Sequence, residues 1–175
     1  MELQQTEVKN GKEGLHINVA QMCVTAVLMA LTCVATMVVQ IPIPLGYAHL
    51  GDSVILISAY FFGPVVGASA MADILTGYAI WALPTLLIKT IMPVIACAFF
   101  KNNVQRCKVF SIRGIAGAVV TLLFMTAGYV FFGGILYGSA AAGIASAPGL
   151  LLKSVVNLAV YLFVAFGISK VKKFN

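Results

Sequence analysis

The residues of this sequence that could do chemistry are a few charged side chains set in apolar surroundings. Between residues 16 and 169, outside a basic loop at 101–113, the charged residues are Asp52, Asp73, Lys89 and Lys153. A charged side chain inside a lipid bilayer is costly and is usually retained for a function. Two carboxylates and two ammonium groups predict a polar binding site for a small molecule.

The composition places these charges in a membrane protein. The chain has 175 residues, of which 61% are hydrophobic and 9% charged, and its mean hydropathy is +1.03. Such a chain has too little polar side-chain surface to cover a soluble domain. The net charge of +6 does not indicate nucleic-acid binding, because the basic residues stand in small groups at segment ends.

The apolar segments predict an all-α integral membrane protein with six transmembrane helices. A helix needs about 20 apolar residues to cross a bilayer. We expect a cytosolic N-terminal segment at 1–15, a six-helix membrane domain at 16–170 and a cytosolic tail at 171–175. The predicted spans are 16–39, 52–62, 65–80, 84–100, 113–138 and 148–170, with loops that include 40–51, 81–84 and 139–147. The second and third spans are short, so one re-entrant hairpin is the alternative.

The loop charges predict the orientation of these spans. Nine of the eleven Lys and Arg residues lie in the two terminal segments and the 101–113 loop, and the loops at 40–51, 81–84 and 139–147 carry none. The positive-inside rule therefore places both termini in the cytosol. In this topology the four intramembrane charges fall between the outer face and the midplane, which predicts a pocket open to the outside.

The candidate ligand-binding residues surround these charges. Asp73 and Lys89 lie on neighbouring predicted spans and could form a structural ion pair or a ligand site. Lys153 favours a ligand site, because no acid follows residue 73. Asn157 and Thr85 lie one helical turn from Lys153 and Lys89, where they could bind ligand or join helices. The outer-loop candidates are His49, Tyr47, Tyr78 and Trp81, either as membrane-interface anchors or as a stacking lid.

Other features of the sequence predict structure rather than chemistry. Asp52 or Ser53 is expected to cap the second helix.

The four cysteines form no C-x-x-C pair, and we expect no metal and no cofactor. No P-loop and no nucleophile with its base is present, so we expect no enzyme. A membrane transporter without its own ATP-binding motif is a passive conduit, a proton-coupled carrier, or a subunit that receives its energy from partner proteins.

Several motifs resemble one family of membrane proteins. They are LGDS at 50–53, GP at 63–64, DILTGY at 73–78, PTLLIK at 84–89, and the small pair Ala26-x-x-x-Ala30. Together they resemble the substrate-binding S components of energy-coupling factor (ECF) vitamin transporters over residues 16–170. The nearest branch is the one associated with hydroxymethylpyrimidine, vitamin B6 and riboflavin-like substrates.

The resemblance implies partners, a location and a substrate class. It implies a transmembrane coupling subunit that contacts Ala26 and Ala30, two ATPase subunits, and a multi-pass location in a bacterial cell membrane. A small pyridine or pyrimidine alcohol suits the mixed acids and lysines. The alternative substrates are riboflavin and pantothenate, whose negative charge suits the two lysines. The alternative function is a stand-alone carrier coupled to protons through Asp73.

Overall fold

The chain is described by a computed structural model over residues 19–43, 46–62, 73–75, 77–100 and 109–171. The helices are α1 (Val19–Val38), α2 (Gly51–Phe62), α4 (Ala82–Phe100), α5 (Ile112–Leu136) and α6 (Ala140–Val171), with a short 3-10 helix η1 (Ala79–Trp81) before α4. Two strands, β1 (Ile41–Ile43) and β2 (Gly46–Ala48), lie between α1 and α2. Most of the predicted third span lies outside the described residues.

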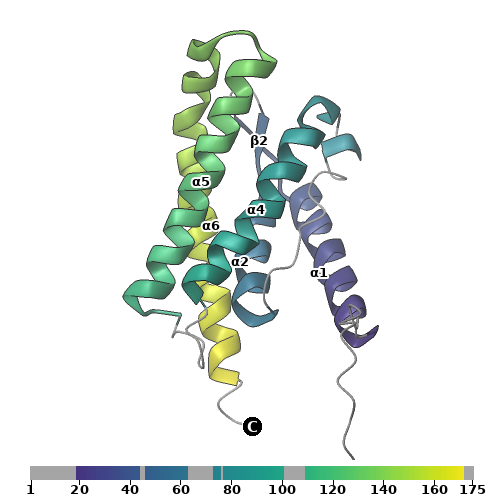
Figure 1. Cartoon of the computed structure of the whole chain (residues 1–175), viewed down its shortest axis with the longest axis vertical. Coiled ribbons are helices and arrows are strands. Elements are labelled where there is room, and N and C mark those ends of the chain that lie inside the picture. The colour runs from purple at the N-terminus through teal and green to yellow at the C-terminus, as the bar shows by residue number, and fades with distance from the viewer. Residues whose placement is uncertain (1–18, 44–45, 63–72, 76, 101–108, 172–175) are drawn as a thin grey trace, which may run out of the picture.

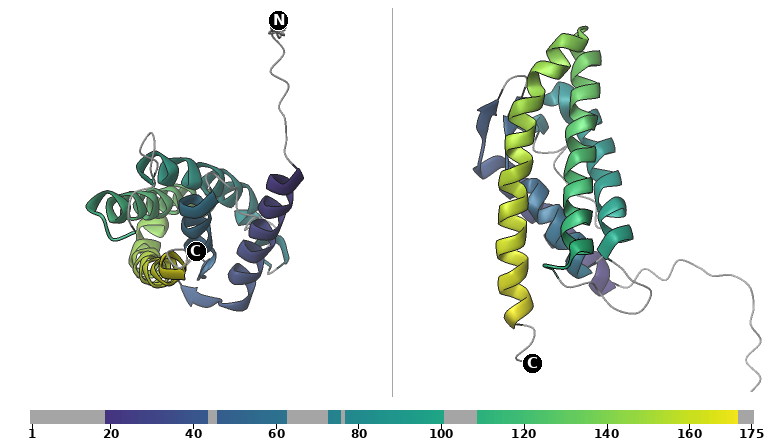
Figure 2. Two further views of the ribbon diagram at one scale, coloured as in Figure 1. Left: turned by 90° about the horizontal axis from the view of Figure 1, so that it is seen from below. Right: turned by 90° about the vertical axis from the view of Figure 1, so that its left-hand side faces the viewer.

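The helices form a bundle in which α5 packs between α4 and α6 (Figure 1). Helix α2 packs against both α4 and α6, and α1 lies at the edge of the molecule against α2 (Figure 2). The buried core includes Phe100 and Tyr161, whose rings stack at 5.9 Å between centroids. Long apolar side chains on the outer faces of α4, α5 and α6 are exposed, as expected of a lipid-facing surface.

The long helices confirm a helical membrane protein. Three described segments are long and apolar enough to span a bilayer: Ala79–Phe100, Ile112–Leu136 and Ala140–Ile168. Helix α2 has 12 residues, which at about 1.5 Å per residue is shorter than the roughly 30 Å hydrocarbon core. The count of six spans remains a prediction.

Three predicted loops have regular structure. The predicted loop at 81–84 is wrong, because η1 ends at Trp81 and α4 begins at Ala82. The segment after α1 forms an antiparallel hairpin in which Ile41 pairs with Ala48 and Ile43 with Gly46. The predicted loop at 139–147 is wrong, because α6 begins at Ala140 and contains Pro148. Alanine has the highest helix propensity, and packing against neighbouring helices allows proline inside a helix within a membrane.

The bundle has two distinct ends (Figure 1). The hairpin, η1 and the turn between α5 and α6 lie toward one end, which we call the hairpin end. The start of α1, the end of α4, the start of α5 and the end of α6 lie toward the opposite end. Gly138, at φ 65°, makes the turn after α5 possible, because a residue with a Cβ rarely adopts this conformation.

Candidate functional site

Three helices bring their charged residues to one buried point. Asp52 of α2 forms an ion pair through Oδ1 with Lys89 Nζ of α4, and its Oδ2 lies 3.1 Å from Lys153 Nζ of α6. All three side chains are buried. The prediction that Asp52 caps α2 is therefore wrong, and so is the alternative in which Lys89 pairs with Asp73. A carboxylate between two buried ammonium groups stabilises both, because each charge would otherwise lack a partner.

Tyr129 of α5 completes this charged cluster. Its ring centroid lies 5.6 Å from Lys89 Nζ and 5.1 Å from Lys153 Nζ, within the range of cation–π attraction. Its hydroxyl lies 3.0 Å from the Thr85 hydroxyl. Sequence reasoning missed Tyr129, because an aromatic residue in an apolar helix carries no signal of the face it presents.

His49 joins the hairpin to the charged cluster. Its Nε2 lies 3.0 Å from Lys153 Nζ, and the Gly51 amide donates to its Nδ1 at 3.2 Å. Burial, followed by the charges of Lys153 and Lys89, lowers the pKa of His49 well below 6.5. The imidazole is therefore neutral at physiological pH.

Asn157 links α6 to the start of α2. Its Oδ1 accepts from the Ser53 amide at 2.8 Å and from the Ser53 hydroxyl at 2.6 Å. Its Nδ2 donates to the carbonyl oxygens of His49 at 2.8 Å and Lys153 at 2.9 Å. A side-chain amide has two donors and two acceptor sites, so the protein itself satisfies all of them. This arrangement favours the helix-joining role over direct ligand contact.

Asp73 lies beside the hairpin, where it forms no described ion pair but its charge acts on Lys153 and Tyr129. Its Oδ1 accepts a 2.5 Å hydrogen bond from the Tyr47 hydroxyl. The Tyr47 ring in turn lies 4.7 Å from the Tyr78 ring and 5.3 Å from the His49 ring, measured between centroids. The Thr85 side chain also interacts with the Asp73 carboxyl, while Oδ2 is buried and meets no geometric hydrogen-bond partner among the described residues. The acceptor can therefore take a hydrogen bond from a ligand.

Trp81 is buried rather than at the lipid interface. Its ring packs 5.6 Å from Tyr129 and 6.2 Å from Tyr137, and Nε1 donates to the Tyr137 hydroxyl at 3.4 Å. Together with Thr85, this places an aromatic wall next to the charged cluster on the α4–α5 side.

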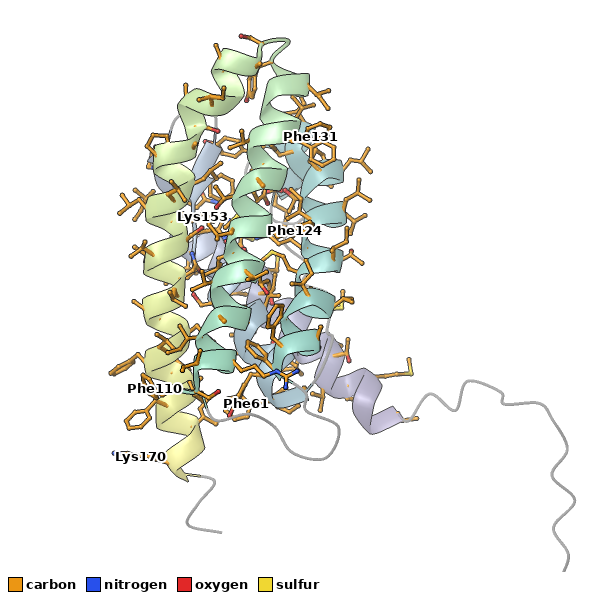
Figure 3. All side chains as sticks on the ribbon, turned by 60° about the vertical axis from the view of Figure 1, so that its left-hand side comes forward. Phe61, Phe110, Phe124, Phe131, Lys153 and Lys170 are labelled. Atoms are coloured by element: carbon orange, nitrogen blue, oxygen red, sulfur yellow. The ribbon has the colours of Figure 1, made fainter. Side chains whose placement is uncertain are left out.

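A cavity of about 140 Å³ lies between the hairpin and α6. His49, Lys153 and Asn157 line it, but the surface that the lining residues present to the cavity is almost entirely apolar. The remaining lining residues are Val39, Ile41, Ala48, Leu50, Gly149, Leu152 and Val156. Lys153 lies in the half of α6 nearer the α5–α6 turn, whereas Lys170 lies at the opposite end (Figure 3). A mostly apolar cavity with a few polar groups suits a small organic molecule.

The remaining predicted residues lie away from this site. Ala26 and Ala30 are exposed on α1, so neither is buried by internal packing. No group of three or more His, Cys, Asp or Glu residues with metal-binding geometry occurs among the described residues. The site can bind and orient a ligand through charge, hydrogen bonds and aromatic contacts.

Comparison with known proteins agrees with this architecture. Residues 16–170 match the family described as "ECF-type riboflavin transporter, S component". A protein of Pyrococcus woesei with the name "Uncharacterized protein in gap 3'region" is 39% identical over 108 residues, which cover 57% of this chain and 72% of that protein. The family match covers nearly the whole apolar region, so this chain belongs to the S components of ECF-type riboflavin transporters and is a multi-pass membrane protein of a transport system.

Proposed function

We propose that this chain is the substrate-binding subunit of an ATP-driven vitamin importer and holds a small heteroaromatic vitamin near the hairpin end. The observation that carries the proposal is the convergence of buried charged and aromatic side chains from α2, α4, α5 and α6 on one cluster, from which Lys153 and its neighbour His49 reach the lining of a cavity. The absence of an ATP-binding motif from the sequence supports a subunit that borrows its energy.

The chemistry of the site favours a pyridine or pyrimidine alcohol, such as pyridoxine or hydroxymethylpyrimidine. Asp73 Oδ2 can accept from a ring or amino N–H, and Lys153 can donate to a hydroxyl oxygen. Thr85 adds a hydroxyl, and Tyr47, Tyr78 and Trp81 offer aromatic faces. The family match favours riboflavin as the second candidate, because its aromatic ring system uses the same contacts.

The family supports a set of partners and an orientation. An S component works with other ECF transporter components, and we propose a transmembrane coupling subunit and two ATPases. The positive-inside rule assigns the opposite end of the bundle, where Lys170 lies, to the cytosol. The pocket then faces outward in a membrane domain at 16–170, between cytosolic segments at 1–15 and 171–175.

Mass spectrometry of small molecules that co-purify with the chain, followed by titration of each candidate, tests the substrate. Bound pyridoxine or hydroxymethylpyrimidine supports the first candidate and bound riboflavin the second. Bound pantothenate retains the transporter class and contradicts the heteroaromatic substrate.

Substitution of Lys153 tests the location of the site. Lys153→Met keeps the length of the side chain and removes its charge, so the bound vitamin should be held more than about tenfold more weakly, as expected for a buried polar contact. Lys170→Met, on the same helix but at the opposite end, is the matched control and should bind normally. Equal affinity in both variants places the ligand elsewhere.

The rival function is a stand-alone carrier driven by protons through Asp73. Purified chain should bind its vitamin without nucleotide, and vesicles that contain the chain alone should not accumulate it. Accumulation driven by a proton gradient in such vesicles would support the carrier.

A further inference from the structure

We propose that Lys89 and Lys153 form an anion-binding site that the chain fills with its own carboxylate, Asp52. The site therefore recognises small carboxylates when Asp52 is absent, and in the native protein it rejects them. This inference concerns the charge selectivity of the site and does not depend on which vitamin the transporter carries.

The geometry is that of a bound anion. The two oxygens of the Asp52 carboxylate are divided between two ammonium groups, Oδ1 toward Lys89 and Oδ2 toward Lys153. The two lysines come from different helices, α4 and α6, and the carboxylate comes from a third. The Tyr129 ring lies within 5.6 Å and 5.1 Å of the two Nζ atoms, so its negative face supports both cations.

No other described acid forms an ion pair with either lysine. Asp73 is engaged with the Tyr47 hydroxyl, and residues 74–175 contain no acid in the sequence. His49 contacts Lys153 and is neutral because burial lowers its pKa. Removal of Asp52 therefore leaves Lys89 without a paired carboxylate and leaves Lys153 with the charge of Asp73, with which it forms no described ion pair. Unpaired buried ammonium groups are strongly unfavourable in a site of low polarity.

The cavity next to Lys153 explains how this affects ligands. Lys153 lines the cavity through the apolar part of its side chain, while its ammonium is paired with Asp52. An anionic group that entered the cavity would have to compete with Asp52 for the ammonium. An uncharged hydroxyl needs no such exchange, because it can accept one hydrogen bond from Lys153 while the ion pair remains. Asp52 is thus a specificity-determining residue.

Chemical rescue with sodium formate tests the anion site. The readout is the melting temperature of the purified chain in detergent, followed by the fluorescence of its single tryptophan, Trp81. Asp52→Ala opens space for a one-carbon carboxylate and should melt at a higher temperature as formate is added. The rise should follow the logarithm of the formate concentration and reach roughly 2–5 °C for formate about tenfold above its dissociation constant. Sodium gluconate at the same ionic strength controls for salt, since gluconate is too large for the space.

Three further proteins make the result specific to the lysine pair. The native chain should not respond to formate. Asp73→Ala removes the same charge outside the pair and should not respond either. The double variant Asp52→Ala/Lys89→Met lacks half of the anion site and should lose the response. A folded Asp52→Ala that ignores formate, or a native chain that responds equally, overturns the proposal.

A second pair of variants covers the case in which Asp52→Ala does not fold. Asp52→Asn keeps the shape of the side chain but leaves both lysines unbalanced, so it should melt below the native chain. Adding Lys89→Met to Asp52→Asn restores the balance of charge and should recover part of that loss. A double variant that melts no higher than Asp52→Asn contradicts the role of Asp52 as a counter-ion.

Matched ligands extend the test to transport and rest on the proposed function. Pyridoxine and 4-pyridoxate differ only in an alcohol against a carboxylate. The native chain should prefer the alcohol, and Asp52→Asn should shift the ratio of the two affinities by about tenfold toward the acid. If neither compound binds the native chain, the proposed substrate is wrong while the formate result still decides the anion site. A native preference for the acid overturns the inference.

Discussion

Tyr129 contacts both lysines of the charged cluster. Its ring faces both lysines and its hydroxyl reaches Thr85, so one side chain contacts the polar groups of α4 and α6 together. At this scale the site depends on side chains whose partners come from other elements. The same holds for His49, whose Nε2 lies 3.0 Å from Lys153 Nζ and whose Nδ1 accepts from the Gly51 amide.

The buried His49 predicts a loss of stability in mild acid. Burial, then Lys153 and Lys89, keep the pKa of His49 well below 6.5 in the folded state, whereas the unfolded chain protonates near 6.5. The unfolded state therefore binds more protons as the pH falls. The contribution of His49 is fully present above about pH 6.5 and is lost as the pH falls toward the folded pKa.

The melting temperature between pH 7.5 and pH 5.5 measures this effect. The native chain should melt at a lower temperature at the acidic end of this range. His49→Gln should flatten the dependence, because glutamine does not titrate. His16→Gln, the same substitution at the other histidine of the chain, should leave the slope unchanged. An identical slope in both variants would assign the acid sensitivity to other groups.

At the scale of elements, the contact between α5 and α6 depends on glycine. A Cβ at Gly143 of α6 would collide with the Val130 carbonyl oxygen of α5 and approach the Gly134 amide nitrogen to 2.9 Å. Both are backbone atoms, so the helices themselves would have to separate. This close approach holds the hairpin end of the bundle together next to the α5–α6 turn.

Gly143→Ala should therefore destabilise the protein. We expect a loss of about 1–3 kcal/mol, as for overpacking of a filled interior, seen as a lower melting temperature in detergent. Gly167→Ala is the matched control on the same helix, because its Cβ would meet no atom within 4 Å. Alanine also has the better helix propensity, so the control should be neutral or slightly stabilising. Equal losses in the two variants would contradict a helix contact at Gly143.

Asn157 holds α2 to α6 and should matter for stability as well as for position. Asn157→Ala leaves the Ser53 amide, the Ser53 hydroxyl and the His49 carbonyl without these partners. A buried polar group left unsatisfied costs about 1–3 kcal/mol, so the melting temperature should fall. Thr121→Val is the control, because the buried Thr121 hydroxyl bonds only to the Gly117 carbonyl of its own helix in the described structure. A fall no larger than that of Thr121→Val would mean that Asn157 is not needed for this junction.

At the scale of the whole molecule, α1 presents a broad surface away from the bundle. Most of its large apolar side chains are exposed, whereas Thr32 and Thr36 are buried. Ala26 and Ala30 are exposed one helical turn apart. Small residues at this spacing allow another helix to approach closely, which is the reason to expect a partner subunit here.

Bulky substitutions on α1 should separate coupling from binding. Ala26→Trp and Ala30→Trp should reduce vitamin uptake and recovery of the complete transporter, because the partner helix can no longer approach. Vitamin binding by the isolated chain should be unchanged. Leu123→Trp, on the exposed face of α5, is the control and should assemble normally. Loss of binding in the isolated Ala26 or Ala30 variants would contradict a role confined to coupling.

The sequence by itself determined the class of protein and singled out its four intramembrane charges. Apolar length and charge count are properties of the chain alone, so they predicted a helical membrane protein and drew attention to Asp52, Asp73, Lys89 and Lys153. Family motifs could be read in the same way, because they are contiguous, and the family match over residues 16–170 confirms the S component family.

Only the tertiary structure decided how those residues meet. Asp52 lies near Lys89 and Lys153 because α2 packs against both α4 and α6. The local sequence does not specify how far each helix is rotated about its axis, and this rotation decides which side chains face one another. The sequence therefore predicts a helix cap at Asp52 or Ser53 and leaves open whether Lys89 pairs with Asp73 or meets a ligand. The helix at 140–147 escaped prediction because small residues and Pro148 signal a loop in water, whereas packing against α5 favours helix. Which side chains of different helices meet depends on their depth in the bundle, on the rotation of each helix and on how the helices pack, and only the folded chain fixes these.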